Sequence, residues 1–149
     1  MNKGRLHLQI LLILFRIAQR SRSRRSALRP LAPLLVALYR VPALFLYGID
    51  IPTRTVIGRG LSVHHGFGIV IHADSVIGNN VTLRQGVTLG AKAGGRPPVI
   101  GDRVDLGAAS MVIGSITVEP DAVVGAGAVV TRDVRAQTVV AGNPARPIT

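Results

Sequence analysis

From Ile51 onward an aliphatic residue recurs every sixth position, in three successive blocks. These anchors are Ile51, Ile57 and Val63; then Ile71, Ile77, Leu83 and Leu89; then Ile100, Leu106, Val112, Val118, Val124 and Val130. The residue four positions after an anchor is usually small or aliphatic. A fixed period of this kind indicates stacked repeats that share one core. We expect each hexad to supply one short strand and one corner, and three hexads to close one triangular coil of a parallel β-helix. A β-sandwich would instead alternate at period two.

Glycine often follows an anchor directly, and we expect it to adopt a turn conformation that a Cβ would oppose. The period breaks twice. The interval from Val63 to Ile71 is two residues longer than a hexad, so two residues are inserted after a histidine pair, His64 and His65. A longer loop, AKAGGRPPV, separates Leu89 from Ile100. Breaks in a solenoid free residues from packing, so both are candidate functional segments.

The chain divides in composition near residue 48. Residues 1–49 hold nine Lys or Arg and no acid, whereas residues 50–149 hold nine against seven acids. We therefore predict a basic, leucine-rich helical hairpin over 1–47 and a β-helix over 48–149. The 149-residue chain contains no cysteine, which excludes disulfides and a cysteine nucleophile.

The N-terminal segment predicts two helices joined by the basic link SRSRRS, with Pro42 expected to kink or end the second. Its apolar runs are short or interrupted, so we expect a hairpin and no membrane span. Arginines beside leucines fit an anionic membrane surface. An alternative that fits equally well is that the leucines pack on neighbouring subunits and the arginines are simply solvated. Nucleic acid is not expected, because no aromatic residues are interleaved with the basic ones.

The histidine pair lies outside the buried positions of its hexad. A metal site is disfavoured because adjacent strand residues point to opposite faces and no acidic cluster completes a ligand set. The alternative is that both imidazoles are simply solvated and have no functional role. Imidazole with its pKa of ~6.5 suits a general base, which is our preferred interpretation. Asp50 precedes His65 by slightly less than one coil of three hexads, so it is the expected orienting carboxylate on the neighbouring coil.

Three stretches resemble the hexapeptide-repeat acyltransferases of the serine acetyltransferase type. They are GIDIPTRTVIGRGLSVHHGFGIVI, the loop flanked by VTLG and VIGD, and VVGAGAVVTRDV with VVAGNPARPI. The chain is most similar to the short members found with exopolysaccharide biosynthesis, such as the colanic acid acetyltransferases. The resemblance implies a left-handed parallel β-helix, an exception to the usual crossover rule. It also implies a homotrimer with acetyl-CoA between subunits.

The same resemblance implies that His65 is the general base, with Asp50 its partner and His64 beside it. CoA contacts are implied near Gly90, Ala108 and Ala126, and Thr131 and Arg132 match positions that approach the CoA phosphates. For these last two, an ordinary corner and a solvated arginine fit as well. Backbone N–H groups of the Gly66–Gly68 turn are a candidate oxyanion site.

One departure bears on the acceptor. Serine acetyltransferases carry a second histidine in the loop, where this chain has Pro97. We therefore expect an acetyl-CoA-dependent O-acetyltransferase that acts on a sugar hydroxyl of an exopolysaccharide or its lipid-linked precursor. It needs no metal, and it works in the cytoplasm or on the inner face of the cytoplasmic membrane. The alternatives are a serine O-acetyltransferase and a non-catalytic solenoid scaffold.

Overall fold

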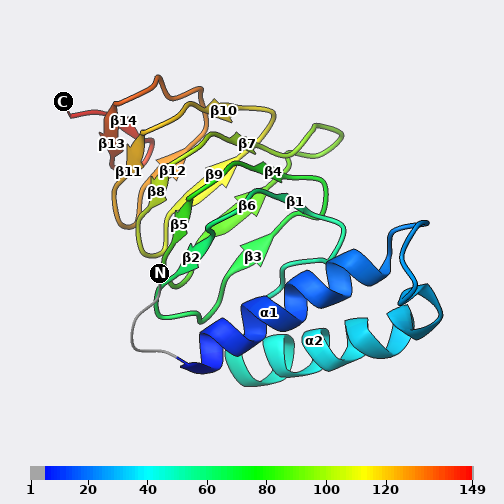
Figure 1. Ribbon diagram of the computed structural model, residues 1–149. Helices are drawn as coiled ribbons and strands as arrows, with labels where there is room; N and C mark the ends of the chain where they lie inside the picture. The colour runs from blue at the N-terminus through cyan, green and yellow to red at the C-terminus, as the bar shows by residue number, and fades with distance from the viewer. Residues whose placement is uncertain (1–5, 149) are drawn as a thin grey trace.

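The computed structural model describes residues 6–148, which form a helical hairpin followed by a parallel β-helix (Figure 1). The hairpin consists of α1 (Leu6–Ser21), the 3₁₀ turn η1 (Arg29–Leu31) and α2 (Ala32–Tyr47). Three short strands make up each coil of the β-helix. Its strands are β1 (Val56–Ile57), β2 (Ser62–Val63), β3 (Val70–Ile71), β4 (Val76–Ile77), β5 (Thr82–Leu83), β6 (Thr88–Gly90), β7 (Val99–Ile100), β8 (Asp105–Leu106), β9 (Met111–Ile113), β10 (Thr117–Val118), β11 (Val123–Val124), β12 (Val129–Val130), β13 (Val139–Ala141) and β14 (Arg146–Pro147).

The strands stack into three sheets that form the sides of the coil. The first sheet runs β1-β4-β7-β10, the second β2-β5-β8-β11-β13-β14, and the third β3-β6-β9-β12. All pairs are parallel except β13 with β14, which closes the far end of the second sheet. The predicted parallel β-helix with an N-terminal helical hairpin is confirmed, with about four coils.

The repeat period and the strand register agree. Leu106 pairs with Val124, the anchor three hexads further along the chain. Val63 pairs with Leu83 across three hexads plus the insertion at the histidines. Leu83 pairs with Leu106 across three hexads plus the extra residues of the longer loop. Both insertions therefore bulge at corners and leave the anchors aligned, and all thirteen predicted anchors are buried.

The glycines that follow anchors have a different role from the one predicted. They lack the positive φ of a left-handed turn; instead, they lie where consecutive coils approach most closely. A Cβ on Gly107 would be 2.6 Å from the backbone nitrogen of Ala126. Left-handed residues occur two positions later, for example Asn80 and Arg103 with φ of 56° and 58°. Glycine is needed here for space between backbones, a constraint that one hexad read alone does not reveal.

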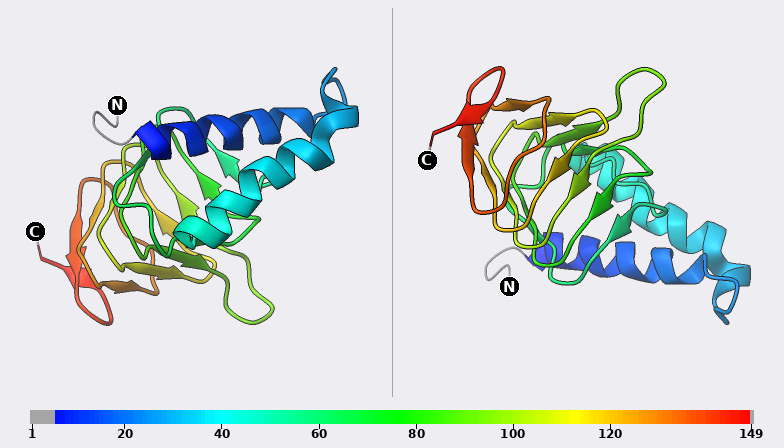
Figure 2. Two further views of the ribbon diagram at one scale, coloured as in Figure 1. Left: turned by 90° about the horizontal axis from the view of Figure 1, so that it is seen from below. Right: turned by 90° about the horizontal axis from the view of Figure 1, so that it is seen from above.

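The hairpin covers the end of the β-helix at which the first coil begins (Figure 1 and Figure 2). Phe15 of α1 and Tyr39 of α2 are buried, pack edge to face with ring centroids 5.3 Å apart, and join the core of the first coil. Arg16 donates to the carbonyls of Ile57 and Gly58, the first at 2.8 Å. These groups belong to the first strand of a sheet, which has no preceding strand to pair with it. Helix α1 therefore protects an exposed sheet edge.

Helix α2 does not end at Pro42, which was one of the two predicted effects of this proline, but continues through it to Tyr47. It ends at Gly48, whose N–H donates to the carbonyl of Leu44 and whose left-handed conformation directs the N–H of Ile49 to the carbonyl of Ala43 at 2.8 Å. Among the described residues, one helical segment, Arg29–Tyr47, is long and apolar enough to cross a membrane by length and composition. The sequence prediction of no such segment relied on its interruption by Arg40 and prolines, which the helix accommodates.

Candidate functional site

The predicted site residues gather around the third sheet. Its outward row consists of Val70, Thr88, Met111 and Val129, each of which directly precedes an anchor and is exposed or half-buried. Asp50 pairs with Val70 in a parallel bridge and so extends this row by one step. The remaining candidates lie at the two corners that flank the sheet.

The histidine pair occupies the corner between β2 and β3. His64 keeps the hexad register, because its N–H donates to Leu83 just as the N–H of Arg84 donates to Leu106. The register resumes at Phe67, whose carbonyl accepts from Gly86. The two inserted residues are therefore His65 and Gly66, and not two residues after the pair as the sequence suggested. His65 is itself part of the insertion.

Local conformation separates the two imidazoles. His65 is exposed and adopts the left-handed region with φ of 50°, which is unusual for a non-glycine residue and is often found at functional sites. His64 is half-buried, and its Nε2 lies 3.1 Å from the hydroxyl of Ser62. His65 is thus the better placed of the two to meet a substrate.

The hairpin supports this corner. Gly66 is buried, and a Cβ on it would be 2.8 Å from the Leu8 side chain in α1. The N–H of Gly68 donates to the carbonyl of Tyr47 at the end of α2, and the Phe67 and Tyr47 rings are 5.7 Å apart. These helix residues position the insertion. No sequence signal pointed to them, because they are ordinary members of an apolar helix.

Asp50 lies at the start of the third sheet, but its carboxylate partner is a helix residue. Its N–H donates to Ile69 and its carbonyl accepts from Ile71, which fixes its backbone in the sheet. Its Oδ1 accepts from Arg40 of α2 at 3.1 Å, and both side chains are partly exposed. The sequence paired Asp50 with His65 by coil length and treated Arg40 only as an interruption of an apolar run.

The predicted oxyanion site in the Gly66–Gly68 turn receives little support. The Phe67 N–H donates to the carbonyl of His65 at 2.6 Å, and the Gly68 N–H is bonded to Tyr47. Gly66 is covered by the core and by Leu8. Two of the three amides are therefore already engaged, and the third is buried.

The predicted CoA positions divide between the two corners of the third sheet. Ala108 and Ala126 stack in the same corner as the histidines, where the N–H of Gly127 donates to Ala108. Gly90 and Thr131 directly follow the strand anchors of β6 and β12 and so lie at the opposite edge. The two groups are not brought together within one chain but lie on either side of one sheet.

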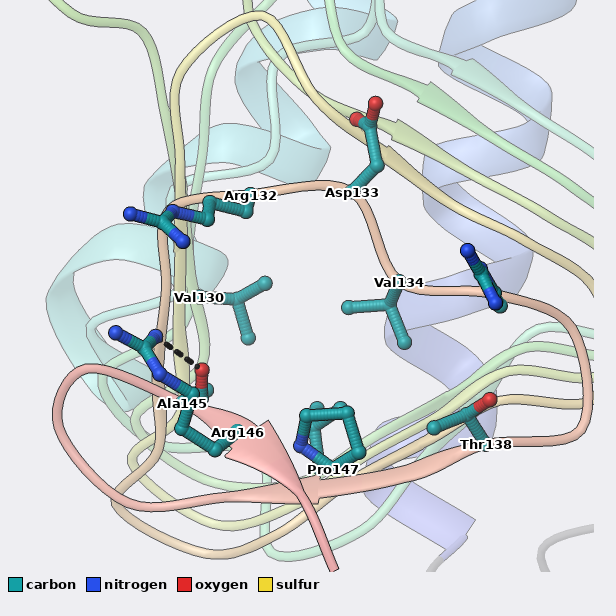
Figure 3. Close-up of a pocket in the computed structure, with 10 residues that line it drawn as sticks. Val130, Arg132, Asp133, Val134, Thr138, Ala145, Arg146 and Pro147 are labelled. Carbon is teal, nitrogen blue, oxygen red and sulfur yellow. Dashed lines mark hydrogen bonds between the residues drawn. The ribbon is translucent and has the colours of Figure 1, made fainter.

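Arg132 lines a pocket of about 370 Å³ at the C-terminal end of the β-helix (Figure 3). Arg132 and Arg146 extend along one side of it, and Arg146 donates to the carbonyl of Ala145 at 2.9 Å. Arg135 also lines this pocket. Exposed guanidinium groups of this kind suit phosphate oxygens, which they can bind through two hydrogen bonds. The sequence singled out Arg132 but not Arg135 or Arg146.

Within residues 6–148, no group of three or more His, Asp or Glu side chains lies close enough to hold a metal ion. The side chains that the site presents are the imidazole of His65, the carboxylate of Asp50 and the guanidinium of Arg132. A strand-bordered corner presents a histidine, and an arginine pocket lies further along the same solenoid, which is the arrangement that the resemblance to hexapeptide-repeat acyltransferases implies.

Comparison with known proteins agrees with this class. A family model described as the hexapeptide repeat of succinyl-transferase matches residues 97–132. Serine acetyltransferase 2 of Arabidopsis thaliana is 44% identical over 106 residues, which cover 69% of this chain and 33% of that protein. A putative colanic acid biosynthesis acetyltransferase of Escherichia coli is 40% identical over 117 residues, 77% of this chain and 72% of that protein. A serine acetyltransferase structure in complex with CoA superposes with a TM-score of 0.76 at 33% identity, over 93% of this chain and 55% of that one.

The chain belongs to the hexapeptide-repeat acetyltransferases of the serine acetyltransferase type, as the resemblance implied. It spans about a third of the plant relatives and 64% of the Helicobacter pylori serine acetyltransferase.

Proposed function

We propose that this protein transfers an acetyl group from acetyl-CoA to a sugar hydroxyl of an exopolysaccharide or its lipid-linked precursor. The observation that carries the proposal is the inserted, exposed His65 at one edge of the third sheet. A member of this family with a single well-exposed imidazole at the solenoid corner has the group that a hydroxyl acceptor requires.

In this mechanism the imidazole of His65 takes the proton of the acceptor hydroxyl, and the hydroxyl oxygen attacks the thioester carbonyl of acetyl-CoA. A tetrahedral intermediate forms and collapses with loss of the CoA thiolate, which receives the proton from the imidazolium. No enzyme-bound acyl group is needed. Asp50 would orient the ring of His65, and to do so its carboxylate must share or exchange the Arg40 contact.

The acyl donor is proposed to lie along the third sheet. Coils are about 4.8 Å apart, so the first and fourth are separated by roughly 14 Å along the axis. His65 and Arg132 also lie at opposite edges of this sheet, so the donor would cross it obliquely, with the thioester near His65 and the phosphates near Arg132 and Arg146. The CoA complex of a related serine acetyltransferase supports acetyl-CoA as the donor.

A trimer is proposed because one chain leaves the site incomplete. The His65 corner and the corner with Gly90, Thr131 and the 91–98 loop lie at opposite edges of the same sheet. A neighbouring chain placed against the third sheet would bring its loop to the first chain's histidine. The exposed Val70 and Met111 on that sheet are suited to such an interface.

We propose that the 91–98 loop determines the choice of acceptor. Ser115 holds the backbone of this loop in place, since the Oγ of Ser115 accepts from the N–H of Arg96 at 2.8 Å and donates to the carbonyl of Arg96 at 3.0 Å. Pro97 follows directly, where the resemblance places a histidine in serine acetyltransferases. Proline offers no side-chain hydrogen bond to a serine carboxylate. The colanic acid relative, which this chain covers to 72%, also favours a glycan acceptor.

Serine O-acetylation is the second candidate, and the 44% identity to a plant serine acetyltransferase favours it. Thiol release from acetyl-CoA separates the two, with free serine as one acceptor and exopolysaccharide oligosaccharides as the other. We expect release with the glycan and only background release with serine. Turnover with serine alone would establish the second candidate. A chain that does not bind acetyl-CoA at all would be a scaffold, and the proposal would be wrong.

A further inference from the structure

The outer face of α1 is apolar although its inner face already supplies the core. Four exposed residues recur at spacings of four, three and four, which places them on one side of the helix. They are Leu6, Ile10, Ile13 and Ile17. The buried residues of the same helix, Leu8, Leu11, Phe15 and Ala18, lie on the opposite side. An amphipathic helix of a globular protein would be polar on the outer side.

Helix α2 repeats this arrangement. Its exposed stripe has the same spacing and consists of Leu34, Leu38, Val41 and Phe45, the last 78% exposed. Tyr39 and Ala43, on the opposite side, are buried. Both helices cover the same end of the β-helix (Figure 2), and since their buried residues face it, the exposed stripes face away from it.

Positive charge is concentrated where the two helices join. Arg20, Arg22, Arg24, Arg25 and Arg29 are all exposed in or beside the connecting turn. This turn projects beyond the edge of the β-helix (Figure 2). Residues 1–49 contain no acid. The surface thus combines two apolar stripes with an unneutralised cationic tip.

We propose that this hairpin face binds the surface of an anionic phospholipid bilayer and holds the β-helix beside it. Acyl chains cover the stripes and headgroup phosphates neutralise the arginines, as in interfacial helices. A second copy of the chain would not cover this face well, because it would place one arginine cluster against another, and residues 1–49 contain no acid to offset the charge repulsion. This surface contact is independent of the acceptor and donor of the proposed reaction.

The helix lies on the bilayer and does not cross it. The hydroxyl of Tyr39 donates to the carbonyl of Ile51 at 2.9 Å, and Arg40 pairs with Asp50, so the middle of α2 is fixed to the β-helix. A crossing helix would break both contacts and carry Arg40 into the hydrocarbon.

Co-sedimentation with vesicles of equal parts phosphatidylglycerol and phosphatidylcholine tests the charge component. We expect binding at low salt that is released as salt rises. Arg24→Ser with Arg25→Ser should weaken binding roughly fivefold per arginine, about 30-fold together. The matched control, Arg59→Ser with Arg96→Ser, removes two exposed arginines from the β-helix and should leave binding nearly unchanged. If the two double variants lose vesicle binding equally, or if the parent protein does not bind vesicles at low salt, the proposal is wrong.

The absence of native cysteine allows a second test with a single fluorescent label. A polarity-sensitive dye on Leu38→Cys should shift to the blue when vesicles are added, and one on Val99→Cys, exposed on the first sheet, should not. A blue shift at Leu38 without vesicles that grows with protein concentration would identify a second copy as the occupant. Protein that stays in vesicles at high salt and alkaline pH would show a spanning helix. Either result would refute surface docking.

Discussion

Replacing Arg16 by methionine tests whether the hairpin closes the open edge of the β-helix. The change keeps the length and apolar stem of the side chain and removes only the guanidinium. Arg16 donates to the carbonyls of Ile57 and Gly58, and Gln19 of the same helix donates to Thr55 at 2.9 Å. Burial and the neighbouring Arg20 lower the pKa of Arg16, but a guanidinium remains charged at any working pH.

The expected loss follows from these contacts. A hydrogen bond from a charged group contributes about 1.5–3 kcal/mol, and Arg16→Met removes three: two to the carbonyls of the sheet edge and one to Oε1 of Gln19 at 3.0 Å. Because the site is only half-buried, water replaces part of this, and we expect about 2–4 kcal/mol less unfolding free energy. The bond from Gln19 to Thr55 remains, but Gln19 loses its own partner Arg16, so it does not replace the contacts to Ile57 and Gly58. The change should also loosen the insertion that Leu8 covers.

Urea unfolding at fixed protein concentration measures the difference, since association would otherwise shift the midpoint. Arg20→Met is the matched control. It lies one turn further on, is exposed, and should cost no more than about 0.5 kcal/mol. If the two variants unfold at the same urea concentration, the carbonyls are satisfied by water and α1 does not protect this edge.

Three further outcomes are expected. His65→Ala should reduce kcat by roughly 10²–10⁴-fold with little change in CoA affinity, and His64→Ala should be milder; equal effects in steady-state assays would mean that the wrong imidazole was chosen. Sedimentation equilibrium should give three times the 15.7 kDa chain mass, and an active monomer would contradict a site shared between subunits. Acid should destabilise the fold through Asp102, whose pKa is lowered below its ordinary 3.8 by the backbone and side-chain N–H groups of Asn79. That stabilisation is present above pH 3.8 and is lost as pH falls through the lowered value, so thermal melts of Asp102→Asn should vary less with pH in that range than those of the parent protein.

The strands were predictable because the coil obeys a local rule. Each anchor, such as Leu106 or Val124, must lie inside, and a period of six fixes which residues share a corner. The pairing of strands between neighbouring coils therefore followed from counting residues along the repeat. The role of Gly107 could not be deduced in this way, because its constraint is the backbone of Ala126 on the next coil, a contact that depends on the stacking distance.

The site was predicted less completely, and the missing part is the contribution of the hairpin. Asp50 and His65 were placed by coil length, which locates backbone positions but not the partner of a carboxylate. Arg40 comes from a helix whose orientation depends on the packing of Phe15 and Tyr39. Helix propensity and periodicity do not determine how a hairpin docks on another element, so its polar contacts stay hidden until the packing is known.

The two corner insertions have a consequence for how such an enzyme can change. Since Val63 still pairs with Leu83, and Leu83 with Leu106, added residues at either corner leave the stacked strands undisturbed. Selection can therefore lengthen, shorten or replace the 91–98 segment without refolding the solenoid. Under the proposed function, exchange of that segment between relatives is a route to new acceptors that leaves the histidine corner unchanged. In engineering terms, the scaffold and the specificity element are separable parts of one short chain.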